Sequence, residues 1–198
     1  MNNLIRVLAC ASLSGALASS TFAGGITIVT HGFNADLVWV NAMANAIANR
    51  SGTPGVNVTR LNLVVTEVSG SLVVSMSPIA VAPDPTFSTG EFVIGLDWTA
   101  IDSFARSDGD QFLAFDPASP AGQQSVPTQN VALAVFNFLQ TWTYGGQSIL
   151  AHPVHLIGHS RGGALVASLA RSMGERGVWV DHLTTLDPVP VGLFGDAA

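Results

Sequence analysis

The stretch "PVHLIGHSRGGALVASLARSM", residues 153–173, constrains the fold more than any other part of the chain. It begins with a short apolar run that is typical of a buried strand and continues with apolar residues at helical spacing. The segment between them, "GHSRG", fits the pattern G-x-S-x-G. Such a sharp turn requires Gly158 and Gly162, because a Cβ at either position would collide with the crossing strand and helix. The stretch therefore predicts a strand–turn–helix unit with Ser160 at the tip of the turn.

The rest of the chain repeats this alternation of strand and helix. Short apolar runs at 26–32, 91–98 and 181–188 predict three further core strands. Apolar residues at helical spacing predict one helix that begins after Asp36 and another over 128–141. This order predicts an α/β fold with a mostly parallel sheet, flanking helices and right-handed crossovers.

Two segments between these elements differ in composition. Residues 56–90 contain two apolar runs around Ser69-Gly70, which predicts a β-hairpin, and then a proline-rich stretch. We interpret 56–90 as an insertion, because it is too small to hold a core of its own. Residues 99–126 are polar and contain Gly, Pro and Asp, which predicts a loop over the sheet.

The overall composition limits the classes of partner. The chain has 198 residues, 48% hydrophobic and 10% charged, which is sufficient for the core of one domain over residues 24–198. The net charge is −6 and no basic cluster is present, which argues against nucleic acid as a partner. After the N-terminal segment no apolar run reaches the roughly 18–20 residues of a membrane-spanning helix, so we expect no transmembrane segment.

The N-terminal segment has the features of a signal peptide. Arg6 is followed by a short apolar stretch, and small residues allow cleavage after Ala18 or Ala23. We therefore interpret residues 1–23 as a cleaved signal and expect a secreted or periplasmic protein. Cys10 is the only cysteine, so the mature chain has no disulfide, cysteine nucleophile or cysteine metal ligand. A lipoprotein site at Cys10 is the weaker alternative, because the apolar run before it is brief.

Ser160 is the candidate nucleophile. The turn would hold its hydroxyl clear of the carboxyl edge of the sheet, where open α/β sheets bind ligands. The alternative is an ordinary glycine-rich turn with a capping serine. Acyl transfer also needs N–H donors for an oxyanion, and we expect one from Arg161 at a helix N-terminus and another from the loop at 31–34. We interpret His31 as a structural residue under this loop, since the expected triad order is serine, acid, histidine.

The candidate acid is Asp187, which closes the run "LTTLDP". The helix after Ser160 returns the chain to the sheet, so both residues are expected at the same edge. The alternative for Asp187 is to cap the following turn. Asp97 also ends a strand but precedes the serine, which makes it the second candidate.

The segments "TIVTHGF", "FVIGLDW", "VHLIGHSRGG" and "TTLDPVP" together resemble lipase-type α/β-hydrolases in order and spacing over about residues 25–190. The resemblance implies Ser160 as nucleophile, Asp187 as triad acid, and the N–H groups of Phe33 and Arg161 as the oxyanion hole. It also implies hydrolysis of carboxylic esters, often lipids, without metal or organic cofactor. Arg161 stands where animal lipases usually carry leucine. Many α/β-hydrolases take their acid from one strand later, in which case Asp187 would be structural.

No histidine of the sequence is well placed to be the base of this triad. His155 and His182 lie five residues before the serine and the acid, roughly 16 Å from the active edge at about 3.3 Å per residue. His152 is further back, His159 points away across its strand, and His31 lies in the wrong loop.

We therefore predict an α/β-hydrolase fold that lacks its last strands, with the triad histidine beyond residue 198. Without that histidine the chain should be nearly inactive, because its loss costs on the order of 10⁶-fold in rate. A last strand with an unpaired apolar edge favours truncation over a complete non-catalytic protein. The leading function is a serine hydrolase that cleaves small-molecule or lipid esters through an acyl-enzyme. The alternatives are a non-catalytic binding protein with the same fold, and an amidase or peptidase with the same triad.

Overall fold

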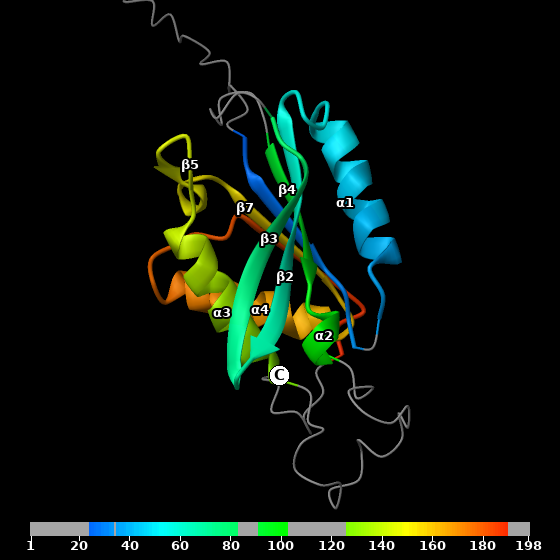
Figure 1. Cartoon of the computed structure of the whole chain (residues 1–198), viewed down its shortest axis with the longest axis vertical. Coiled ribbons are helices and arrows are strands. Elements are labelled where there is room, and N and C mark those ends of the chain that lie inside the picture. Colours follow the sequence, from blue (N-terminus) through cyan, green and yellow to red (C-terminus); the bar gives the residue numbers. More distant parts are fainter. Residues whose placement is uncertain (1–23, 34, 83–90, 103–125, 190–198) are drawn as a thin grey trace, which may run out of the picture.

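The computed structural model describes residues 24–33, 35–82, 91–102 and 126–189. At its centre lies a six-stranded sheet with the strand order β3-β2-β4-β1-β7-β8 (Figure 1). All neighbouring strands are parallel except β3, which is antiparallel to β2. The strands are β1 (Ile26–Thr30), β2 (Val58–Val68), β3 (Ser71–Ala80), β4 (Glu91–Asp97), β7 (Val154–His159) and β8 (His182–Leu186).

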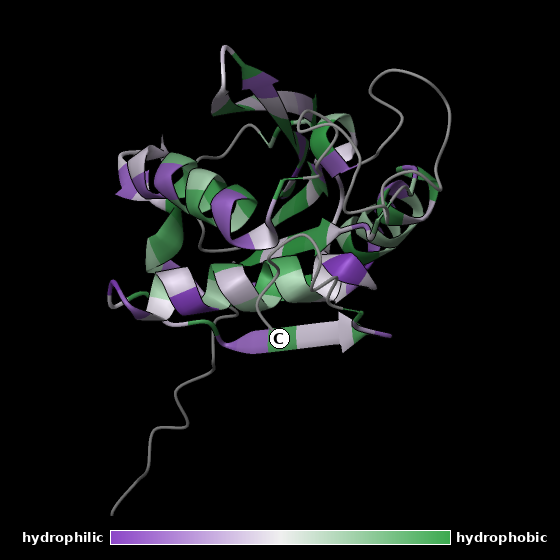
Figure 2. Cartoon of the chain, turned by 90° about the horizontal axis from the view of Figure 1, so that it is seen from below, coloured by the Kyte–Doolittle hydropathy of each residue, from purple (hydrophilic) through white to green (hydrophobic). Residues whose placement is uncertain are grey.

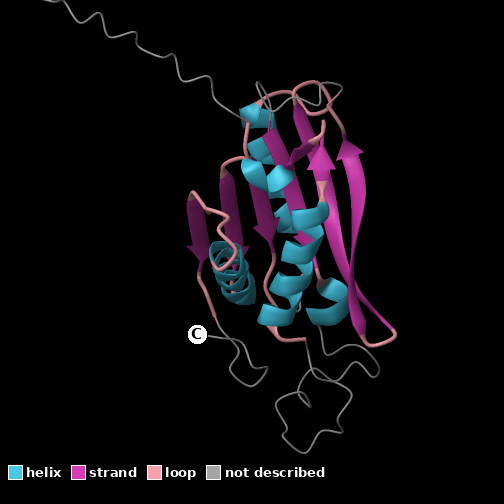
Figure 3. Ribbon diagram, turned by 90° about the vertical axis from the view of Figure 1, so that its left-hand side faces the viewer, coloured by secondary structure: helices cyan, strands magenta, loops and turns pink. Residues whose placement is uncertain are grey.

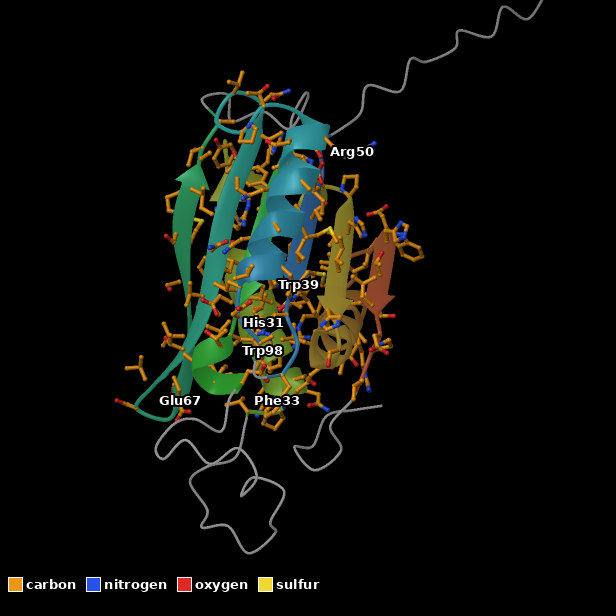
Figure 4. The ribbon with its side chains drawn as sticks, turned by 90° about the vertical axis from the view of Figure 1, so that its right-hand side faces the viewer. His31, Phe33, Trp39, Arg50, Glu67 and Trp98 are labelled. Atoms are coloured by element: carbon orange, nitrogen blue, oxygen red, sulfur yellow. The ribbon has the colours of Figure 1, made fainter. Side chains whose placement is uncertain are left out.

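Helices cover both faces of this sheet. Helices α3 and α4 pack on one face, towards the viewer in Figure 3, and α1 packs on the other, in front of the strands in Figure 4. The helices are α1 (Val38–Ser51), α2 (Thr99–Asp102), α3 (Thr128–Thr141) and α4 (Arg161–Gly174). A small hairpin, β5 (Thr143–Tyr144) and β6 (Gln147–Ser148), and a 3₁₀ turn at Ile149–Ala151 connect α3 to β7. The predicted mostly parallel α/β sheet with flanking helices is thus confirmed.

The sheet is buried between two apolar layers, which accounts for the low charge of the sequence. All five residues of β1 are buried, with Ile26 and Ile28 in the layer under α3 and α4 and Val29 in the layer under α1. Apolar and polar residues alternate along the helices, as expected for helices that bury one side (Figure 2). No helix of the described residues is long and apolar enough to cross a membrane.

Several predictions fall outside the described residues. These are the signal peptide at 1–23, Asn34 in the loop after β1, residues 83–90 of the insertion and most of the loop at 99–126. The proline-rich stretch "SPIAVAPDP" at 77–85 was expected to be a loop, but its first four residues extend β3, where they pair with β2. Of the segment at 99–126, residues 99–102 form the short helix α2 rather than a loop. They follow β4 directly, and the Asp97 side chain caps them by accepting the N–H of Thr99 at 3.0 Å.

The predicted hairpin around Ser69-Gly70 forms, with φ angles of 52° and 78° at these two residues. Both angles are left-handed, as in the two-residue turns that match the twist of paired strands. The hairpin is part of the central sheet, because β2 pairs in parallel with β4 over Val58–Val64. The sequence pattern did not place β2 beside β4, since that pairing joins segments separated by the proline-rich stretch.

Strand β8 lies at the edge of the described sheet and is more polar than expected. None of its five residues is buried: three are exposed and two are half-buried. Leu183 is 43% exposed, and His182, Thr184 and Thr185 are polar. Figure 2 shows the same strand in mostly hydrophilic colours. The expectation of an apolar edge was therefore wrong, because only two of the residues in "HLTTL" are apolar.

Arg60 is a cation buried in the interface between β2 and α1, where its side chain is 1% exposed. The guanidinium donates to three side-chain amide oxygens, those of Asn41 (3.0 Å), Asn45 (3.2 Å) and Asn62 (2.9 Å). Gly95 on β4 leaves room for this cluster, because an added Cβ would lie 2.6 Å from Oδ1 of Asn62. Burial lowers the pKa of Arg60. The asparagines of α1 thus tie the helix to the sheet through one charged side chain.

Replacing Arg60 by methionine should lower the free energy of unfolding by about 3 kcal/mol or more. The substitution removes three part-buried hydrogen bonds from a charged group, and each such bond contributes roughly 1.5–3 kcal/mol. Urea unfolding measures the change. The matched control is Arg50→Met in the exposed last turn of α1, which should change stability by less than about 0.5 kcal/mol. Equal effects of the two substitutions would contradict this account.

Candidate active site

The turn between β7 and α4 has a strained backbone at its tip. Ser160 has φ 53° and ψ −125°, outside the conformations that L-residues ordinarily adopt. A Cβ on Gly158 would lie 2.1 Å from the carbonyl oxygen of Gly162, and a Cβ on Gly162 would lie 2.2 Å from the carbonyl oxygen of His31. Only glycine fits at either position, as the sequence motif predicted. The tip of the turn therefore presents Ser160 between the end of β7 and the start of α4.

The end of β8 brings Asp187 beside this turn. β7 and β8 are paired in parallel up to His159 and Leu186, so Ser160 and Asp187 are the next residues on adjacent strands. The Ser160 N–H donates to the carbonyl of Leu186 at 2.9 Å, and the Ser160 carbonyl accepts the N–H of Val189 at 3.1 Å. Asp187 is exposed and has a left-handed φ of 46°. The two residues predicted as nucleophile and acid thus share one edge of the sheet.

The loop after β1 touches the same turn. A Cβ on Gly32 would lie 2.6 Å from Cβ and 3.0 Å from Oγ of Ser160, so this glycine lets the loop pass close to the hydroxyl. Phe33 follows in the loop and lies at the same end of the sheet as His31 and Trp98 (Figure 4). The segments that carry Phe33 and Arg161 thus both lie next to Ser160, Phe33 through the contact of Gly32 and Arg161 as the following residue.

His31 is buried under this loop and is 0% exposed. Its Nε2 accepts the backbone N–H of Trp98 at 3.2 Å, and its Nδ1 lies 2.7 Å from the carbonyl oxygen of Gly32. The rings of His31 and Trp98 stack with their centroids 5.5 Å apart. Burial lowers the pKa of His31, against smaller opposing effects of the Gly32 carbonyl and of Asp97 and Asp36. With both ring nitrogens engaged, the imidazole holds the loop and is not available as a base.

The other histidines lie away from the hydroxyl of Ser160. His155 and His182 are paired in register near the amino ends of β7 and β8, where their rings lie at 46° to each other with centroids 4.6 Å apart. His152 precedes β7. The ring of His159 lies on the α1 side of the sheet, where it meets the edge of Trp39 at 5.5 Å. None of the five histidines of the sequence, all of them described, occupies the position of a triad base.

The side chain of Arg161 is the part of the site that sequence reasoning missed. The guanidinium is fully buried, 2.7 Å from Oδ1 of Asp102 and 2.8 Å from the carbonyl oxygen of Val126, and lies over the Trp98 ring. Asp102 is itself buried at the end of α2. The only signal in the sequence was an arginine inside a glycine-rich turn, which gives no indication of its partner.

Asp97, the second candidate acid, has a local role. Its Oδ1 accepts both the N–H and the hydroxyl of Thr99, at 3.0 and 2.8 Å, and so caps the start of α2. Strand β1 separates β4 from β7, so Asp97 lies further from the turn than Asp187 does. The described residues contain no group of three or more His, Cys, Asp or Glu arranged to hold a metal ion.

No protein-family model matches the chain, and a search of curated proteins found no match. Among solved structures, the chain is similar to "the putative cell surface hydrolase from Lactobacillus plantarum WCFS1", with 18% sequence identity and a TM-score of 0.47. The similarity covers 88% of this chain and 61% of that chain.

Gly162→Ala should lower the free energy of unfolding by about 3 kcal/mol or more, because the new Cβ would collide with backbone at the end of β1. Gly174→Ala is the matched control in the same helix, since an added Cβ there meets no atom within 4 Å. The control should be neutral or stabilising by up to about 1 kcal/mol. Urea unfolding of both variants measures the difference, and a tolerant Gly162 would refute the close crossing of the turn and the loop.

Stability should decrease as the pH is lowered from about 6.5. The unfolded chain protonates His31 near its ordinary pKa of 6.5, whereas burial lowers the pKa in the folded state. The unfolded state therefore binds more protons in this range, and stability falls with falling pH. His152 and His155 act in the same direction. Urea unfolding measures the free energy of unfolding at pH 7.5 and at pH 5.5. Its decrease between these pH values should be smaller in His31→Asn than in the wild type. Equal decreases would contradict the role given to His31.

Proposed function

We propose that this protein is a serine hydrolase that cleaves carboxylic esters through an acyl-enzyme on Ser160. The observation that supports this most directly is the strained backbone of Ser160 in a turn where Gly158 and Gly162 admit no side chain. Strain of this kind is retained where the surrounding structure fixes it, often at functional sites. The turn holds a hydroxyl at the carboxyl edge of a parallel sheet, the usual place for ligands in such folds.

In the proposed reaction the Ser160 oxygen attacks the ester carbonyl carbon while a base takes the hydroxyl proton. The N–H groups of Phe33 and Arg161 stabilise the negative charge on the carbonyl oxygen, and the position of Arg161 as the first residue of α4 favours negative charge there. Collapse of the tetrahedral intermediate expels the alcohol, which receives the proton from the base. Water then hydrolyses the acyl-enzyme through the same groups in reverse.

Asp187 is the proposed partner of the base, which it would orient and stabilise when protonated. Its place beside Ser160 on the adjacent strand, at the exposed edge, supports this assignment over Asp97, whose carboxylate caps α2. The proposal takes the base to be a histidine contributed by protein outside residues 1–198, because the five histidines within them are placed elsewhere. We further propose that residues 1–23 direct secretion or export to the periplasm.

A second candidate function is non-catalytic binding of an acyl or peptide ligand at the same edge. The observation that favours it is the position of the histidines, which leaves Ser160 without a base from the described residues. The same serine chemistry would also cleave amides, so esters and amides must be compared as substrates.

Labelling of the natural full-length protein with a fluorophosphonate tests the nucleophile. We expect one covalent adduct on Ser160, located by mass spectrometry, and its loss in Ser160→Ala. Ser71→Ala, at the exposed start of β3, should label like the wild type. Asp187→Asn should slow labelling and p-nitrophenyl ester hydrolysis by about 10²-fold or more, whereas Asp97→Asn should change them by less than about tenfold. Folded full-length protein that takes no label would refute the hydrolase proposal and favour the binding function.

A further inference from the structure

Arg161 and His31 belong to one buried network beneath the proposed nucleophile. One oxygen of Asp102 accepts the Arg161 guanidinium at 2.7 Å, and its other oxygen lies 3.8 Å from Nδ1 of His31. All three side chains are 0% exposed. On the other side of the imidazole, Oδ1 of Asp97 lies 3.9 Å from Nε2. Two carboxylates thus flank the imidazole beyond hydrogen-bond distance, and one of them is neutralised by Arg161.

The hydrogen bonds of His31 define which nitrogen carries its proton. Nε2 receives the N–H of Trp98, so it must be the unprotonated acceptor. Nδ1 therefore carries the proton and donates it to the carbonyl of Gly32 at 2.7 Å. The structure requires a neutral imidazole in this one tautomer, because an imidazolium would present a donor to the N–H of Trp98.

This tautomer has a consequence for the next peptide group. In a trans peptide the carbonyl oxygen and the N–H point in opposite directions, and the carbonyl of Gly32 and the N–H of Phe33 belong to one such group. The hydrogen bond from His31 directs the Gly32 carbonyl towards the imidazole, so the N–H of Phe33 points away from the imidazole. Gly32 lies against Ser160, so the direction of this N–H decides whether it can serve an oxyanion on the serine.

We propose that Arg161 and His31 are positioning residues: Arg161 neutralises Asp102 so that His31 stays neutral in its Nδ1–H tautomer, and His31 fixes the direction of the Phe33 N–H. The catalytic meaning of this network rests on the proposed function, whereas the electrostatic link does not. Arg161 thus acts twice, with its backbone N–H as an oxyanion donor and with its side chain through Asp102.

The charges around His31 explain why Arg161 is needed. Burial favours the neutral ring and lowers the pKa of His31, while Asp97 from β4 and Asp36 before α1 favour the imidazolium. Asp102 from α2 carries a charge of the same sign as these two, 3.8 Å from Nδ1. Removing the guanidinium would take away a positive charge that lies 2.7 Å from this buried carboxylate, whose other oxygen lies 3.8 Å from Nδ1. An opposite charge at this distance raises a histidine pKa by about one unit or more. The ring would then protonate near neutral pH and lose its acceptor for Trp98.

Nuclear magnetic resonance of the histidine ring nitrogens tests this link without turnover. In the wild type we expect His31 to remain neutral with the proton on Nδ1 at pH 7. In Arg161→Met the titration midpoint of His31 should rise by about one pH unit or more, a tenfold change in proton affinity. The matched control, Arg171→Met on the exposed side of α4, should leave it unchanged. The amide resonance of Phe33 should move with the same midpoint as His31.

The double variant Arg161→Met/Asp102→Asn removes both charges together and should return His31 to the wild-type tautomer and midpoint. It also provides a second variant, in which both partners of the ion pair are neutral, if Arg161→Met does not fold. A His31 midpoint that is the same in the wild type and in Arg161→Met, or that stays raised in the double variant, would overturn the proposal. So would a Phe33 resonance that stays constant while His31 titrates.

Kinetics of the full-length protein separate this inference from the proposed function. Arg161→Met should lower kcat more than it raises KM, with the larger deficit at acidic pH, and the double variant should recover the pH profile. If Ser160 takes no fluorophosphonate label while His31 responds as described, the hydrolase function fails and the electrostatic link stands. If Ser160 is labelled and His31 does not respond, the function stands and the positioning role fails.

Discussion

The close crossing of two backbone segments at Gly162 and His31 is the constraint on which the site depends. The position of a Gly162 Cβ lies 2.2 Å from the His31 carbonyl oxygen, and that of a Gly32 Cβ lies 2.6 Å from Cβ of Ser160. The loop after β1 and the turn after β7 are therefore in direct backbone contact. A side chain at either glycine would separate them and would move the loop away from the serine. Parallel pairing of β1 with β7 places the two segments side by side, and glycine permits the contact.

The sequence predicted the parts of this site that depend on local patterns. The apolar run before "GHSRG" and the helical spacing after it identified the turn, and the strand that ends at Leu186 placed Asp187 at the same edge as Ser160. It did not predict that β2 belongs to the central sheet, or that Arg161 is buried against Asp102. Both depend on contacts between distant segments, for which no local period exists. Arg161 and Arg60 would be expected at the surface from their charge alone, and both are buried because their partners come from other elements.

The histidines illustrate how burial separates structural from catalytic roles. His31 lies next to the loop residue that contacts Ser160, yet both of its ring nitrogens are used by backbone groups of the same region. A general base needs a nitrogen that can take a proton from the serine and release it, with a pKa near the working pH. The buried imidazole instead has a lowered pKa and a fixed tautomer. Its environment suits a residue that holds a loop in place, and a complete triad requires a different histidine.

The backbone strain of the site points to the same two residues independently of the motif. Among the described residues three non-glycine residues have a positive φ, namely Ser69, Ser160 and Asp187. Ser69 lies in the tight turn of a hairpin, where such a conformation is expected. The other two end neighbouring strands and are joined through the hydrogen bond from Ser160 to Leu186. Ser160, with ψ −125°, lies outside even the left-handed helical region, whereas Asp187 is of a residue type that adopts a positive φ more readily. Their clustering at the carboxyl edge of the sheet supports a functional role for both side chains.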